Sequence, residues 1–127
     1  MVAPNLNQGL FLLDDLRKAG IDVELAAWVL DDTQAYWRLV IVSKKLAGLG
    51  PLRAYDELRS IMQSAQHQTL DLDTIRVAPQ HDRLATLLAG MARTKAIRAG
   101  DVLGPVALAD FSLEGLYIYP LEQSAPA

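Results

Sequence analysis

The sequence predicts an α+β protein, a single two-layer domain over residues 1–127 with its helices packed mainly on one face of a sheet. Apolar residues recur at helical spacing in three segments, and shorter runs rich in β-branched and aromatic residues lie between and after them. The element order is α-β-β-α-β-α-β-β, which gives a mostly antiparallel sheet of about four to five strands with about three helices. We expect residues 1–6 and 123–127 to be frayed ends.

The most apolar segment is a predicted β-hairpin that also contains both tryptophans. Its two strands, residues 23–30 and 37–43, do not alternate between apolar and polar side chains, as a strand with one wet face should. Both faces of this part of the sheet are therefore expected to be buried. The connection between the strands is too long for a two-residue turn, and Asp31 and Asp32 are interpreted there as turn residues.

Two helices flank the hairpin. The first covers about residues 8–19, with Asn7 as its N-cap and Gly20 as its C-terminal stop. The second begins at Pro51, which suits the first helical position, and extends to about Gln66. Its expected apolar side is made of Leu52, Tyr55, Leu58, Ile61, Met62 and Ala65.

The remaining elements are a strand, a helix and a second hairpin. The third strand covers about residues 72–78 and is expected near a sheet edge, and Pro79 opens a helix that reaches residue 94 or 95. Two short strands, 106–111 and 116–121, then form a hairpin that turns at residues 112–115.

Too few helices are predicted to cover both faces of this apolar sheet. Contiguous exposed apolar surface usually marks association, so we expect a homodimer. The expected interface residues are Trp28, Trp37, Tyr117 and Tyr119. In the alternative arrangement, the first helix crosses to the second face and closes the sandwich within one chain.

Composition and charge exclude several classes of function. The chain has 12 basic and 15 acidic side chains, a net charge of -3 and no cysteine. The overall field therefore does not favour nucleic acid or an anionic membrane, and sulfur-based zinc sites and thiolate catalysis are excluded. No signal segment or membrane-spanning run is present, so a soluble, cytoplasmic protein without a cofactor is expected.

One loop has the composition of an anion-binding site. Lysines and glycines between a strand and a helix N-terminus can hold a phosphate on backbone N–H groups. The residues concerned are Lys44, Lys45, Gly48 and Gly50. Neither a P-loop nor a dinucleotide-binding motif is present, and Pro51 removes one of the donors.

Two further clusters are weak candidates. A metal could be held by imidazole and carboxylate groups around the third strand, although their spacing matches no metal motif. The metal candidates are His67, Asp71 and His81. A phosphate-binding patch could be formed by four late basic residues, namely Arg83, Arg93, Lys95 and Arg98.

The leading hypothesis is a small self-associating module without catalytic activity, which acts through protein contacts or as an accessory domain. The first rival is a small-molecule or anion binder, or an enzyme, with a pocket at a dimer interface. That pocket would be formed by Tyr117, Tyr119, Arg38 and the loop 44–50. The second rival is a nucleic-acid-associated protein that uses the late basic residues.

Overall fold

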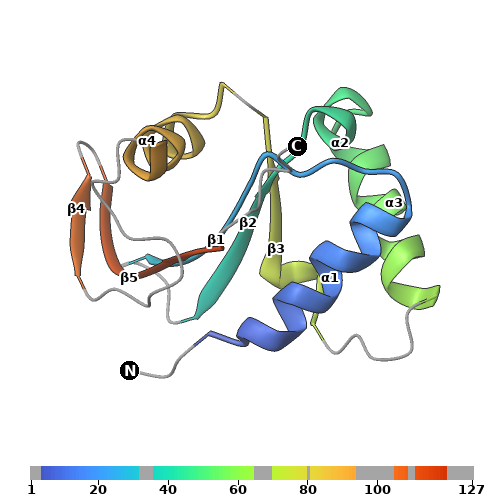
Figure 1. Ribbon diagram of the computed structural model, residues 1–127, viewed down its shortest axis with the longest axis horizontal. Helices are drawn as coiled ribbons and strands as arrows, with labels where there is room; N and C mark the ends of the chain where they lie inside the picture. Colours follow the sequence, from blue (N-terminus) through green and yellow to red (C-terminus); the bar gives the residue numbers. More distant parts are fainter. Residues whose placement is uncertain are drawn as a thin grey trace.

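The chain forms one five-stranded mixed sheet in the computed structural model (Figure 1), which describes residues 4–31, 36–64, 70–79, 81–93, 105–108 and 111–119. The strands are β1 (Leu25–Asp31), β2 (Trp37–Val42), β3 (Ile75–Ala78), β4 (Val106–Leu108) and β5 (Phe111–Ile118). Their order across the sheet is β3-β2-β1-β5-β4. Only the pairing of β2 with β3 is parallel, which confirms a mostly antiparallel sheet.

One helix of the described residues precedes the strands, and the others lie between them. They are α1 (Leu6–Lys18), α2 (Lys44–Gly48), α3 (Pro51–Ser64) and α4 (Arg83–Arg93), with a 3-10 turn η1 (Leu72–Thr74). The α+β class and the element order are confirmed, apart from the short helix α2, which the sequence analysis treated as a loop. None of the described helices combines the length and the apolar composition that a membrane crossing needs.

Helices cover both faces of the sheet, so the arrangement has three layers rather than the two expected. Figure 1 shows α1, α2 and α3 on one side and α4 on the other. A first core packs Leu12, Leu16 and Leu58 against the sheet, and a second core packs Leu84 and Leu88 against its opposite face. The second face is therefore covered within the chain, by α4 and not by the first helix, because α4 carries its own apolar stripe.

The first hairpin has the two-sided burial that its sequence predicts. Leu39 and Ile41 of β2 belong to the first core, while Val40 and Val42 belong to the second. All four side chains are less than 5% exposed, down to 0% for Leu39 and Ile41, with 1% for Val40 and 4% for Val42. The missing alternation in the sequence thus reflects a central strand pair with no wet face.

The first helix begins earlier than expected. Asn5 is its N-cap in place of Asn7, because the Asn5 side chain accepts a hydrogen bond from the backbone N–H of Gln8 (3.3 Å). The expected frayed end therefore holds a buried Pro4 and the helix start, while residues 123–127 lie outside the described residues. Gly20 ends the helix as predicted, at a φ of 81° that suits glycine.

The third strand and the last helix are shorter than expected. β3 begins only at Ile75, after the 3-10 turn, and lies at an edge of the sheet as predicted. α4 begins at Arg83 and not at Pro79. The reason is Asp82, whose carboxylate accepts a hydrogen bond from the backbone N–H of Ala85 (3.1 Å) and so caps the helix.

The second hairpin turns earlier than predicted. Leu108 pairs with Phe111, so the residues 112–115 that resemble a turn lie inside β5. Leu113 is needed in the second core, and the register shift beside Asp31 accommodates this segment in the sheet. The ring of Trp37 lies against the backbone of Gly115, so a Cβ atom at this residue would collide with the ring.

Two glycines inside helices provide a matched test of this packing. A Cβ at Gly9 would collide with the buried side chain of Tyr119, whereas a Cβ at Gly90 would meet no atom within 4 Å. We expect Gly9→Ala to lower the free energy of unfolding by about 1–3 kcal/mol through overpacking. Gly90→Ala should leave it unchanged or raise it by up to about 1 kcal/mol through helix propensity.

Urea denaturation of both variants measures the difference. Equal effects of Gly9→Ala and Gly90→Ala would contradict the close approach of α1 to Tyr119.

Candidate functional site

The four aromatic residues expected at an interface lie inside a single chain. Trp28, Trp37, Tyr117 and Tyr119 are 1%, 9%, 8% and 2% exposed, and all belong to the first core. Tyr117 in β5 and Tyr119 just after its end share one face of the sheet, as predicted, with an angle of 86° between their rings and 5.0 Å between centroids. They therefore face α1 and not a second molecule, because the helices on this side cover the sheet.

The hydroxyl group of Tyr119 joins the sheet to α1. It accepts a hydrogen bond from Nε1 of Trp28 (2.7 Å) and donates one to the carbonyl of Leu6 (2.8 Å). Burial raises the pKa of Tyr119 to about 12, so the proton needed for the second bond is present at neutral pH. The arrangement has a structural role, since one hydroxyl pairs with both the buried indole N–H of Trp28 and the carbonyl of Leu6.

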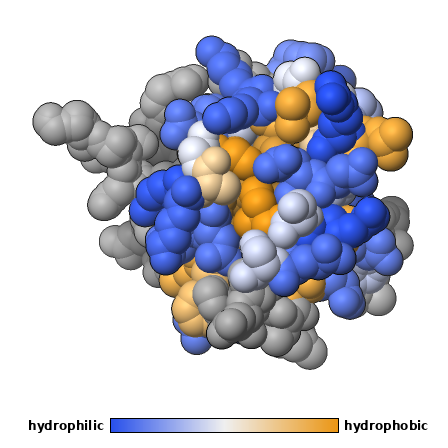
Figure 2. Space-filling model, turned by 90° about the vertical axis from the view of Figure 1, so that its right-hand side faces the viewer, coloured by the Kyte–Doolittle hydropathy of each residue, from blue (hydrophilic) through white to orange (hydrophobic). Residues whose placement is uncertain are grey.

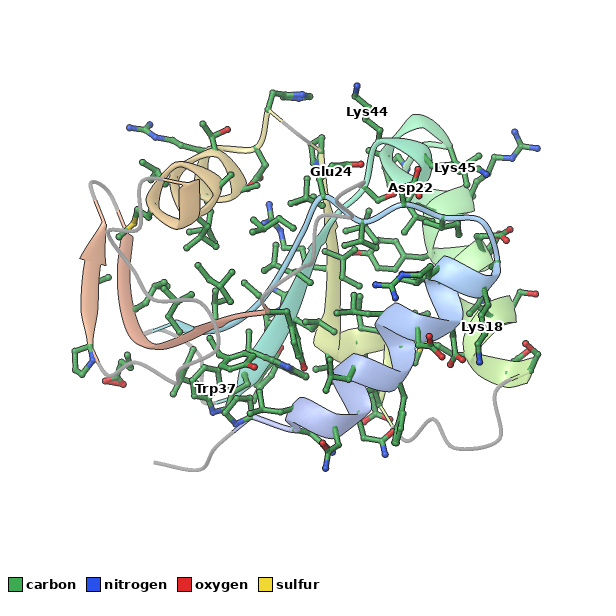
Figure 3. The ribbon with its side chains drawn as sticks, viewed as in Figure 1. Lys18, Asp22, Glu24, Trp37, Lys44 and Lys45 are labelled. Atoms are coloured by element: carbon green, nitrogen blue, oxygen red, sulfur yellow. The ribbon has the colours of Figure 1, made fainter. Side chains whose placement is uncertain are left out.

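The anion-binding hypothesis meets a helix start at which two backbone N–H donors are already bonded within the chain. The backbone N–H of Lys44 donates to the Glu24 carboxylate (2.9 Å), and that of Leu46 donates to Oγ of the buried Ser43 (3.3 Å). Lys45 Nζ donates to the carbonyl of Gly20 (2.9 Å). Figure 3 shows Lys44 and Lys45 beside Asp22 and Glu24 at this end of the molecule. A carboxylate of the protein thus takes the place of an external anion.

The two glycines of that hypothesis shape the connection from α2 to α3. Gly50 has a φ of 88°, a conformation that glycine adopts without strain, and its N–H donates to the carbonyl of Ala47 (3.2 Å). A Cβ at Gly48 would meet nothing within 4 Å. Gly50 therefore permits the turn into Pro51, and Gly48 lies at the open surface.

The metal hypothesis finds no support in the described part of the chain. Asp71 precedes the 3-10 turn and His81 is exposed just before α4, while His67 lies outside the described residues. No group of three or more His, Asp or Glu side chains among the described residues is placed to hold a metal ion.

The late basic residues do not converge where the structure describes them. Arg83 and Arg93 are the first and last residues of α4, which separates their Cα atoms by about 15 Å at the helical rise. Lys95 and Arg98 lie outside the described residues. A patch that includes both ends of α4 would therefore have to extend along the whole helix.

The rival pocket draws on groups that the sheet separates. Arg38 alternates with Trp37 and Leu39, so it lies on the sheet face of the second core, whereas Tyr117 and Tyr119 lie on the face of the first core. Nε of Arg38 is buried without a hydrogen-bond partner, the one such side-chain atom among the described residues.

Arg76 and Asp82 form an ion pair on the side of α4. Nη2 of Arg76 lies 2.6 Å from Oδ1 of Asp82, and the Asp82 side chain is 16% exposed. Burial acts to raise the pKa of this carboxyl, but the hydrogen bond and charge of Arg76 and the N–H of Ala85 outweigh it. The pKa of Asp82 therefore lies below its ordinary value of 3.8, and the ionised form holds α4 to β3.

Exposed apolar side chains on the side of α1, α2 and α3 were not predicted from the sequence. Leu52 is 77% exposed and Leu49 is 38% exposed, on either side of Gly50. Figure 2 shows apolar patches among hydrophilic residues on the side of the molecule where Figure 1 places α1, α2 and α3. The prediction that Leu52 lies on the apolar side of α3 is wrong. At 100° per residue it shares a stripe with Asp56 and Arg59, both exposed, and this mismatch was the available signal.

Comparisons with family models, with curated proteins and with solved structures find no match for this chain. Its function has therefore to be inferred from the contacts, burial and charges of its own residues.

The Asp82 pair predicts a pH dependence of stability. A lowered folded-state pKa contributes stability that is present above the unfolded-state pKa, near 3.8, and is lost as the pH falls through the folded-state value. At pH 7 we expect Asp82→Asn to lower the free energy of unfolding by about 1–2 kcal/mol, because it removes the charge that pairs with Arg76. The loss is limited because solvent screens part of the pair. This deficit should shrink below about pH 4.

Denaturation across this pH range gives the measurement. Asp56→Asn is the matched control, because its pair with Arg59 (3.4 Å) is 61% and 57% exposed on the two side chains. It should change stability by less than about 0.5 kcal/mol. A pH-independent deficit in Asp82→Asn would contradict the role of the ionised carboxylate.

Proposed function

We propose that this chain is a non-catalytic protein-interaction module that acts through its helical side, the surface of α1, α2 and α3. One observation carries the proposal. Among the described residues, five large apolar side chains are exposed, and four of them lie on this side. They are Leu10 (51%), Phe11 (41%), Leu49 (38%) and Leu52 (77%), and the fifth is Tyr36 (52%). Exposed apolar groups gathered on one side favour a binding surface.

The rival functions have weaker support. A small-molecule site needs polar groups that converge in a concavity, and Arg38 and the two tyrosines face opposite sides of the sheet. A nucleic-acid surface needs clustered cations, and Arg83 and Arg93 stand at opposite ends of α4. The net charge of -3 also opposes approach to a polyanion.

Self-association is the second part of the proposal, and α1 offers the surface for it. Leu10 and Phe11 are neighbours on this helix, and Nζ of Lys18 lies 3.1 Å from Oδ2 of Asp14 on the same outer surface. A two-fold contact brings a patch against its own copy. Leu10 and Phe11 would then meet the same residues of the second chain, flanked by charges that are already balanced.

Light scattering on a sizing column tests this homodimer. We expect the wild type to have twice the mass of one chain, 13.9 kDa, and Leu10→Asp to be a folded monomer, because a charge would be buried in the contact. Tyr36→Asp is the control, since Tyr36 is as exposed as Leu10 but lies on the connection before β2. A wild-type monomer at every concentration, or a dimer that survives Leu10→Asp, would reject this interface.

A further inference from the structure

We draw no further inference here: the strongest candidate, the surface patch of exposed Leu49 and Leu52 at the connection from α2 to α3, lies among side chains of both charges, and nothing in the described part of the structure shows what covers it.

Discussion

The burial of the β1–β2 hairpin on both faces is the constraint on which the rest of the structure depends. A strand pair with apolar side chains on two faces is stable in water only when something covers each face. The first face receives α1 and α3 through Leu12, Leu16 and Leu58, and the second receives α4 through Leu84 and Leu88. The positions of α1, α3 and α4 therefore follow from the hairpin.

Two polar contacts fix these helices in position. Tyr119 connects Trp28 of the central strand to the start of α1, and Gly9 leaves room for its ring. On the other face, Asp82 caps α4 and pairs with Arg76 of β3. With both sheet faces covered in this way, four of the five large apolar side chains that are exposed among the described residues lie on α1 or around the connection from α2 to α3.

The sequence alone was sufficient to predict the structure where one local physical signal dominates. The missing alternation in residues 23–43 predicted the two buried faces, and the glycine after α1 predicted its end. Predictions from the sequence were wrong where tertiary contacts determine the local structure. Ser112 to Gly115 resembles a turn, yet Leu113 and the Trp37 ring require that segment in a strand. Whether α4 crosses to the second face depends on the path of the chain after β3, which local patterns do not encode.

The candidate sites were less predictable than the fold. Trp28 and Tyr119 are residue types that are common at interfaces. Whether they face a partner or the core depends on which helix covers their side of the sheet. Lys44 and Lys45 were predicted as anion-binding residues, but the sequence does not show that the backbone N–H of Lys44 bonds to Glu24 and Nζ of Lys45 to the Gly20 carbonyl, because both partners are distant in sequence. Leu52 could have been found from its position among polar residues of α3, because that stripe is fixed by helical geometry alone.

Hydrogen exchange measured residue by residue tests the central role of the hairpin most directly. The backbone amides of β1 and β2 should exchange more slowly than those of any other described segment, at an opening free energy equal to the global free energy of unfolding. Exchange of these amides through a lower-energy opening, while α1 and α3 stay protected, would contradict a fold organised around a hairpin buried on both faces.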